Sequence, residues 1–208
     1  MRFIGDVHGK YGPYKRIIAE VPSSIQVGDM GIGFRRNGGR DGEFYSNPPH
    51  YAMARANHRF IRGNHDNPSE CRKHSQCIAD GHVDGGVMFI GGGLSVDRQW
   101  RTEGYDWWAD EELSSSELCT LVDVYNVARP NVMVTHDCPE SVAIRMCQLS
   151  GRNKLDFPSR TRQALQSMFE LHQPRLWIFG HWHFSFDSVL DGTRFICLAE
   201  LEHRDLDI

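Results

Sequence analysis

The chain has 208 residues, of which 40% are hydrophobic and 24% are charged. A chain of this length and composition can bury the core of one compact domain, so we expect a single domain over residues 1–208. The formal net charge of −4 argues against a protein that holds duplex DNA, because such proteins neutralise phosphates with a strongly basic surface.

The N-terminal residues lead directly into a polar motif, without the basic leader and apolar stretch of a signal peptide. The sequence also has no apolar run long enough for a membrane-spanning helix. We therefore expect a soluble, cytoplasmic protein with no membrane partner. The six cysteines include no C-x-x-C pair, which indicates mostly buried free thiols and neither a thiolate zinc site nor a redox dithiol.

Short apolar runs and helical patterns follow one another along the chain. The runs at residues 3–4, 25–27, 60–61 and 87–90 are typical of buried strands, as are those at 132–134 and 176–179. Apolar periodicity predicts helices over residues 114–128 and 159–172, and Ser114 with Glu117 can form a capping box at the start of the first. Asp191-Gly192 predicts a primed hairpin turn within residues 189–195. The pattern indicates a layered α/β domain.

Two long loops remain, at residues 31–49 and 91–112. Loops of this length in a compact domain are usually functional or disordered. Trp107 and Trp108 favour an ordered second loop, and we expect them to pack it onto the core more than to stack on a base or sugar.

Five polar motifs directly follow predicted strands. Loops at the carboxyl ends of strands in an α/β sheet converge on one crevice, where ligands bind. We therefore expect these motifs to meet at one site. They are Gly5-Asp6-Val7-His8-Gly9, Gly28-Asp29, Gly63-Asn64-His65-Asp66, Thr135-His136-Asp137 and Gly180-His181-Trp182-His183.

The side chains of these motifs are of the types that bind metal ions in proteins. Carboxylate, amide and imidazole groups suit Mn above all, with Fe, Zn, Co or Ni as alternatives. Seven such ligands are too many for one tetrahedral ion and fit two ions about 3.5 to 4 Å apart. Each motif alone has a simpler explanation, since Asp and Gly often make turns and His181 with His183 can flank a buried Trp182. Their joint occurrence favours a dinuclear site. We expect the other six histidines to be solvated surface residues.

These motifs resemble the signature of the calcineurin-like metallophosphoesterases, and the resemblance spans almost the whole chain. It implies a four-layer α-β-β-α sandwich with two central mixed β-sheets and a metal-dependent hydrolase of phosphate esters that uses metal-bound hydroxide. It also implies roles for the motif residues: Asp6, His8 and His183 on the first metal, Asn64, His136 and His181 on the second, Asp29 as the bridge, and His65 above the metals on the substrate side.

The chain departs from the protein Ser/Thr phosphatases of this superfamily. Their second motif continues with an Asp and an Arg, where this chain has Met30 to Gly33, so the partner carboxylate for His65 and a phosphate-binding arginine are missing there. His65 is followed by Asp66 where those enzymes have Glu. Residues 91–97, with the arginine, tryptophans and glutamate that follow, resemble a stretch of bacterial and phage members. A general member of bacterial or phage type is therefore indicated.

The remaining candidate residues surround the metal ligands. We expect His65 to stabilise charge or to protonate the departing alkoxide, and we group Asp66 with it as catalytic. Asp66 and Asp137 can orient histidines, and both can equally be turn residues. The candidates for phosphate binding are arginines of the long loops, some of which can instead be solvated: Arg35, Arg36, Arg40 and Arg98.

The expected substrate is a phosphorylated small molecule or a nucleotide. Phosphomonoesterase and phosphodiesterase activities both remain open, and the alternative function is a phosphodiesterase or nuclease acting on nucleotides or nucleic-acid ends. Retention of the full ligand set argues against a scaffold that has lost catalysis.

Overall fold

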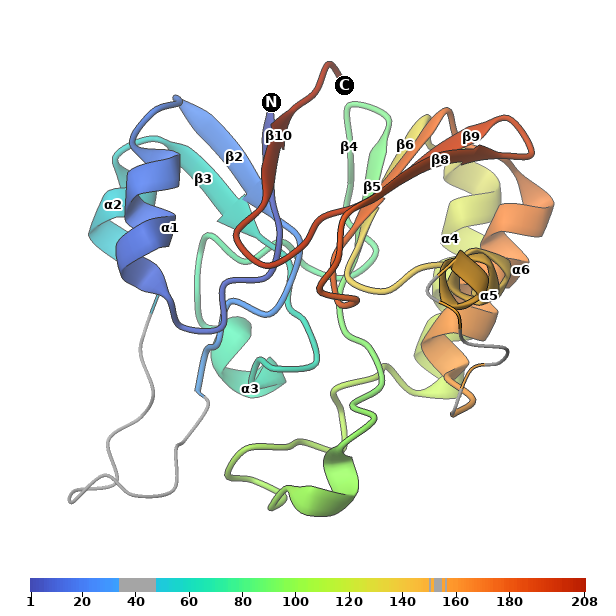
Figure 1. Ribbon diagram of the computed structural model, residues 1–208, viewed down its shortest axis with the longest axis horizontal. Helices are drawn as coiled ribbons and strands as arrows, with labels where there is room; N and C mark the ends of the chain where they lie inside the picture. The colour runs from blue at the N-terminus through green and yellow to red at the C-terminus, as the bar shows by residue number, and fades with distance from the viewer. Residues whose placement is uncertain (34–47, 150, 152–154, 156) are drawn as a thin grey trace.

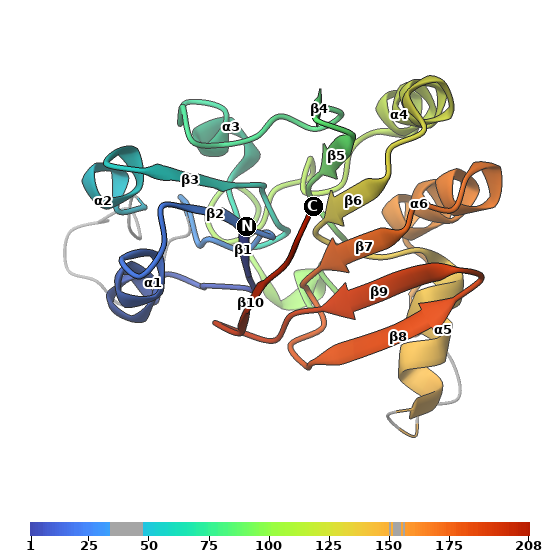
Figure 2. The same ribbon diagram turned by 90° about the horizontal axis from the view of Figure 1, so that it is seen from above.

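The computed structural model describes residues 1–33, 48–149, 151, 155 and 157–208. Two β-sheets pack face to face, and helices cover the outer side of each sheet, so the domain has four layers (Figures 1 and 2). The fold class predicted from the sequence, an α-β-β-α sandwich with two mixed sheets, is confirmed.

The first sheet has four strands in the order β10-β1-β2-β3. Strands β1, β2 and β3 are parallel to one another, and β10 pairs antiparallel with β1 at one edge. The strands are β1 (Arg2–Ile4), β2 (Ser23–Gln26), β3 (Asn57–Phe60) and β10 (His203–Asp205). The helices on this side are α1 (Tyr11–Ile18), α2 (His50–Ala54) and α3 (Pro68–Cys71).

The second sheet has six strands in the order β4-β5-β6-β7-β9-β8. The four central strands are parallel, and the two edge strands are antiparallel to their neighbours. The strands are β4 (Val83–Asp84), β5 (Val87–Ile90), β6 (Val132–Thr135), β7 (Leu176–Phe179), β8 (Phe186–Leu190) and β9 (Thr193–Cys197). The other elements are the short 3-10 helix η1 (Arg98–Trp100), α4 (Ser115–Ala128), α5 (Glu140–Leu149) and α6 (Arg160–Leu171).

Strands β5, β6 and β7 of the second sheet bury both faces, which explains their continuous apolar sequence. In β6, Val132 and Val134 join the cluster between the two sheets, whereas Met133 joins the cluster under helices α4 to α6. Side chains alternate between the faces of a strand, so a strand covered on both sides has no polar face to show. A third cluster, which includes Ile4 and Phe60, lies between the first sheet and its helices.

The predicted local signals are present in the structure. Helix α4 begins with a complete capping box, in which the Glu117 amide donates to Ser114 Oγ at 3.3 Å and the Ser114 amide donates to Glu117 Oε2 at 2.8 Å. Helix α6 begins after Ser159, whose side chain accepts from the Arg162 amide. The turn between β8 and β9 has positive φ at both Asp191 (47°) and Gly192 (84°), as a primed hairpin turn requires.

Two features of the described residues bear on the sequence predictions about solvent exposure. Four of the six cysteines are buried and none forms a disulfide, as expected. The prediction that His58 lies at the surface was wrong, because it faces inward from β3 with 3% of its surface exposed and its Nδ1 lies 2.9 Å from Ser24 Oγ.

No helix in the described ranges has the length and apolar character needed to cross a membrane.

Candidate metal centre

The five polar motifs meet at one end of the two sheets. The loops after β1, β2 and β3 carry the ligands of the first sheet, and the loops after β6 and β7 carry those of the second. These loops lie at the carboxyl ends of parallel strands, which is where the crevice of an α/β sheet forms. The structure brings together all seven residues predicted as metal ligands: Asp6, His8, Asp29, Asn64, His136, His181 and His183.

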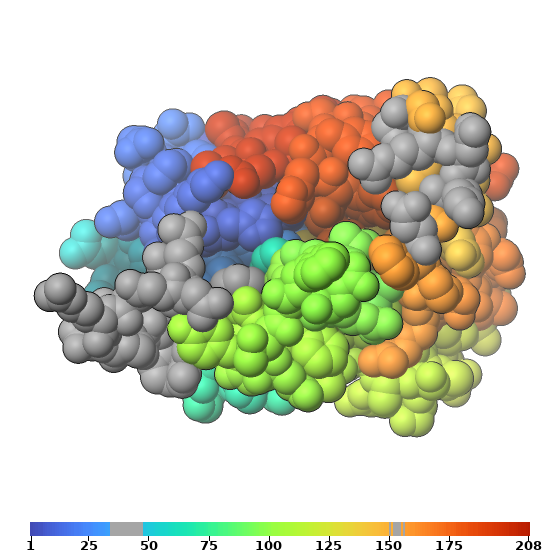
Figure 3. All heavy atoms as spheres, turned by 60° about the horizontal axis from the view of Figure 1, so that its bottom comes forward, coloured from blue at the N-terminus to red at the C-terminus, as the bar shows by residue number. Residues whose placement is uncertain are grey.

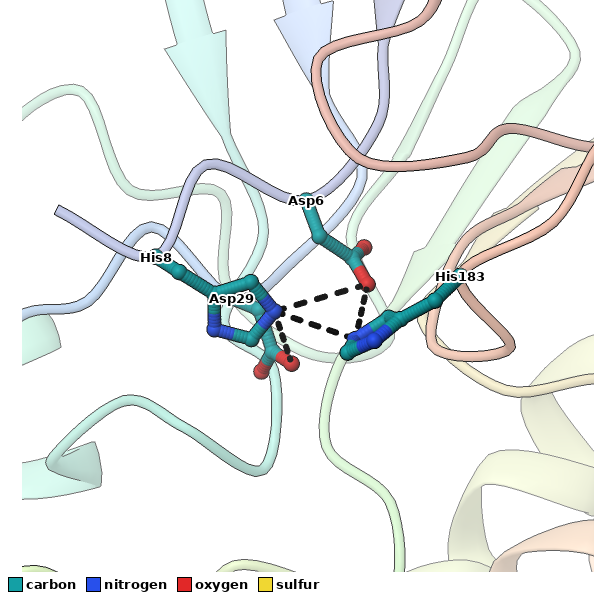
Figure 4. Close-up of side chains that lie close together, drawn as sticks. All are labelled: Asp6, His8, Asp29 and His183. Atoms are coloured by element: carbon teal, nitrogen blue, oxygen red, sulfur yellow. Dashed lines mark hydrogen bonds and ion pairs between the residues drawn. The ribbon is translucent and has the colours of Figure 1, made fainter. Parts of the chain in front are cut away.

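The first group of ligands consists of Asp6, His8, Asp29 and His183, whose ligand atoms all lie within 4.8 Å of one another. Figure 4 shows the two imidazoles and the Asp6 carboxylate turned toward a common point. His8 Nε2 lies 3.1 Å from His183 Nε2, and His183 Nε2 lies 3.2 Å from Asp6 Oδ2. Such convergence of nitrogen and oxygen atoms suits one divalent ion.

The second group consists of Asp29, His136 and His181, with Asn64 between the two histidines. The Asn64 amide oxygen lies 2.9 Å from His136 Nε2 and 2.8 Å from His181 Nδ1. His136 Nδ1 lies 2.9 Å from the carbonyl oxygen of Val27, which fixes the ring and leaves Nε2 facing the group.

Asp29 belongs to both groups through different oxygens. Its Oδ2 lies 3.6 Å from His8 Nε2, and its Oδ1 lies 3.3 Å from His136 Nε2. Oδ2 is buried and has no hydrogen-bond partner, which is costly for a carboxylate oxygen unless a cation binds there. The donor set therefore fits divalent ions, and Asp29 has the position of a shared ligand.

The charges of the two groups influence one another. Burial raises the pKa of Asp29, but the imidazoles of His136, His65 and His8 outweigh burial and hold that pKa well below its ordinary value. Burial lowers the pKa of His136, but Asp29 and Asp6 outweigh burial and raise it to about 10. The pocket thus keeps Asp29 ionised, as a metal ligand must be, whereas His136 has to release its second proton to bind an ion.

The backbone around the ligands adopts conformations that side chains rarely occupy. Positive φ angles occur at His8 (46°), Asp29 (58°), His181 (69°) and His183 (55°). Left-handed conformation costs an L-residue roughly 1–2 kcal/mol, and such strain concentrates at functional sites. The loops therefore hold four proposed ligands in strained positions.

Two glycines of the motifs allow close packing of the ligand loops. A Cβ at Gly28 would collide with the His136 ring, and a Cβ at Gly63 would collide with the Asp29 carboxylate. Gly28 also has a φ of +104°, which glycine adopts without a steric penalty. Gly28 precedes Asp29 and leaves room for the His136 ring. Gly63 precedes Asn64 and leaves room for the Asp29 carboxylate.

His65 lies beside the first group and does not join either one. Its ring centroid is 4.9 Å from that of His8, in an edge-to-face arrangement. Burial is the largest of the causes that lower the pKa of His65 to about 4. Asp29 opposes this change by raising the pKa, whereas Arg101 and His8 also lower it. Among the described residues His65 contacts Arg101, whose Nη2 lies 2.6 Å from His65 Nε2. Sequence reasoning missed Arg101, because the surrounding loop offered no pattern that separated it from other arginines.

Asn64 is fixed by a chain of hydrogen bonds that the sequence also did not reveal. Asn64 Nδ2 donates to Ser95 Oγ at 2.9 Å, and Ser95 Oγ donates to Glu111 Oε2 at 2.6 Å. All three residues are buried, with 5% or less of their surface exposed. The chain keeps the amide oxygen of Asn64 directed at the two histidines.

Asp66, which we grouped with His65 as catalytic, binds the backbone of the loop that follows Asp29. It is fully buried, and its oxygens accept bonds from the backbone amides of four residues: Met30, Gly31, Ile32 and Gly63. A carboxylate engaged in this way holds two loops together. We therefore describe Asp66 as a positioning residue for Asp29.

Of the arginines predicted to bind phosphate, Arg98 lies among the described residues. Arg98 is exposed on η1, and the structure records no contact of its side chain with either ligand group. Arg35, Arg36 and Arg40 lie outside the described residues. Trp108 is buried with 9% of its surface exposed, as expected for a residue that packs its loop onto the protein.

Comparison with known protein families matches residues 2–185 to the calcineurin-like phosphoesterase family. The chain belongs to this family, as its motifs predicted. It is a metal-dependent hydrolase that acts on phosphate esters.

The solved structures to which the chain is similar are distant from it in sequence. A phosphopantetheinyl hydrolase from Mycobacterium tuberculosis is 14% identical, with 96% of this chain and 89% of that chain covered and a TM-score of 0.46. GAP50, the anchor in the inner membrane complex of Plasmodium, is 11% identical, with 96% and 71% covered and a TM-score of 0.46. No curated protein matches the chain in sequence. Neither structural likeness identifies a substrate for this chain.

Proposed function

We propose that the chain hydrolyses phosphate esters at a centre of two divalent ions, with manganese as the preferred metal. The observation that supports two ions is the division of Asp29, which offers Oδ2 to the group with His8 and Oδ1 to the group with His136. One group would bind its ion through Asp6, His8 and His183, and the other through Asn64, His136 and His181.

Bound divalent ions would supply Lewis acidity and would lower the pKa of a bound water, so that hydroxide is available near neutral pH. The protein's own contribution to phosphate binding is the charge of its buried carboxylates. Asp6 and Asp29 are buried and contribute two negative charges, fewer than two divalent ions bring, so the pocket attracts a phosphate anion. The substrate is then a phosphorylated small molecule or a nucleotide.

His65 lies on the substrate side of the ligands. It contacts His8 and Arg101 and is not a member of either ligand group. From this position its ring can donate a hydrogen bond to a phosphoryl oxygen or to the departing oxygen, which stabilises the charge that develops during ester cleavage.

The test combines metal analysis with hydrolysis of p-nitrophenyl phosphate. We expect two ions per chain after loading with manganese, activity that disappears with a chelator, and recovery when manganese is returned. One ion per chain in active protein would refute the dinuclear centre, whereas full activity without any divalent metal would refute metal dependence.

A further inference from the structure

The segment of residues 95–111 lies across the end of the sheets that carries the ligand loops. Figure 3 turns this end toward the reader and shows the segment, in green, in the middle of the face. Its two ends are tied together, because the Ser95 amide donates to Glu111 Oε1 at 2.8 Å and Arg62 Nη1 donates to the Glu111 carbonyl at 2.7 Å. The segment is therefore held in place by buried bonds.

This segment directs one guanidinium toward the site. Arg101 has only 8% of its side chain exposed, and its Nη2 donates to Asp97 Oδ2 at 2.7 Å. Nη2 also lies 2.6 Å from His65 Nε2, and the His65 ring is adjacent to the His8 ring. Arginine is rarely buried unless it is paired, and Asp97 supplies the partner that holds this guanidinium beside the site.

We propose that Arg101 binds the phosphoryl group of the substrate and selects phosphomonoesters over phosphodiesters, an inference that rests on the proposed phosphoesterase site. Guanidinium binds phosphate through two parallel N–H groups, and such charge-assisted bonds are among the stronger ones in proteins. On substrate binding, the fork exchanges its contact with His65 for a phosphoryl oxygen.

The selectivity follows from the number of acceptors. A phosphomonoester has three non-bridging oxygens, whereas a diester has two and an additional ester oxygen, which is a poor acceptor. When one non-bridging oxygen faces each of the two ligand groups, a monoester still has a third to offer to Arg101. A diester turned in the same way places an ester oxygen or its second substituent against Arg101.

Asp97 is a positioning residue in this arrangement. Its carboxylate accepts from the same Nη2 that lies against His65, so the guanidinium is oriented before substrate arrives. Orientation in advance lowers the entropy lost on binding. Arg98, which the sequence suggested for phosphate binding, is exposed three residues earlier and serves as the matched comparison.

The first experiment measures binding of inorganic phosphate by calorimetry to metal-loaded parent, Arg101→Met and Arg98→Met. We expect Arg101→Met to weaken binding about tenfold or more, because bonds to charged groups are lost, and Arg98→Met to bind like the parent. Metal content and thermal unfolding confirm that each variant is intact. Equal binding by Arg101→Met and the parent, or a larger loss in Arg98→Met, would overturn the proposal.

The second experiment compares p-nitrophenyl phosphate with bis(p-nitrophenyl) phosphate. Arg101→Met should lower the ratio of monoester to diester kcat/KM about tenfold, and Asp97→Asn should raise KM for the monoester with a smaller change in kcat. Arg101→Lys keeps the charge without the fork, and it should recover part of the monoester rate. If Arg101→Met is unstable, this lysine variant decides the question, since an unchanged ratio would contradict the proposal.

The two proposals fail in different ways. A metal-loaded parent that hydrolyses neither ester would refute the proposed function and, with it, the selectivity for monoesters. A parent that hydrolyses the monoester, together with an Arg101→Met variant of unchanged ratio, would leave the function standing and refute the role of Arg101.

Discussion

The two groups of proposed metal ligands differ in how firmly the protein holds them. In the group with His136, that ring is completely buried, its Nδ1 faces a backbone carbonyl, and Asn64 is fixed by Ser95. In the other group, His183 has 52% of its side chain exposed and His8 has 18%. The first is a buried half and the second is an open half of one centre.

The difference indicates that the two halves have different roles in metal binding and in substrate entry. Groups behind a ligand fix its orientation and raise its affinity for metal, so we expect the buried half to bind its ion more tightly. The open half faces His65, and through it Arg101, so we expect substrate to enter on that side.

The substitution Asp29→Asn should have the largest effect, because it removes the proposed ligand that the two halves share. Asparagine offers one good acceptor oxygen, and repulsion between two cations would then oppose loading of the second ion. Asparagine also tolerates the left-handed backbone at this position, where φ is 58°, so the fold should remain. We expect loss of at least one ion and collapse of turnover, measured by elemental analysis, kinetics and circular dichroism.

A simple turn role for Asp29 makes the opposite prediction. Asn serves in turns nearly as well as Asp. Parental activity and metal content in folded Asp29→Asn would therefore show that Asp29 does not bridge the halves.

The substitution His65→Asn should leave both halves loaded and still slow the reaction. His65 contacts His8 and Arg101 but belongs to neither ligand group. Roles in acid catalysis or charge stabilisation are worth about 10² to 10⁴ in rate. We expect a fall in kcat of this size with two ions retained. Loss of metal at concentrations that saturate the parent would instead place His65 among the ligands.

The proposed ligands could be recognised in the sequence because they stand in short motifs after recognisable strands. Asp6, Asp29 and His136 each follow an apolar run, and a strand end is visible without knowledge of its neighbours. The same holds for α4, whose capping signal is local. Helix α5 was missed because its apolar periodicity is weak, and strand β10 was missed because it has only three residues. Both elements are defined by the contacts that they make in the folded protein.

The supporting residues were not predicted, for a related reason. Glu111 bonds to Ser95 across 16 residues, and Arg101 meets His65 across 36. No helical or strand repeat relates residues at these separations, so a sequence pattern does not reveal the contacts. The path of the segment between residues 95 and 111 brings these side chains together. The candidate that we chose in this loop, Arg98, has the same chemistry as Arg101, and its exposure could not be read from the sequence.

The substitution Ser95→Ala should weaken the buried half alone. It removes the hydroxyl that joins Asn64 to Glu111 and leaves a buried Glu111 oxygen without that partner. Losing a partner behind a metal ligand typically costs 10- to 100-fold in affinity, so we expect a loss within about that range for one ion and little change for the other. Competition with a chromophoric chelator measures both, and Ser167→Ala, on the exposed face of α6, is the control. Equal weakening of both ions would contradict the division.

The smallest effect concerns backbone strain in the open half, and it is visible without metal. His183 has a φ of 55°, so replacing it with glycine removes a left-handed strain that alanine retains, while both variants lose the same imidazole. We expect metal-free His183→Gly to be more stable than His183→Ala by about 1 kcal/mol, or about 2–4 °C in Tm. His203 on β10 is exposed and has no positive φ, so there the order should reverse, because glycine weakens a strand. Greater stability of the alanine variant at both positions would show that the ligand loop stores no strain at His183.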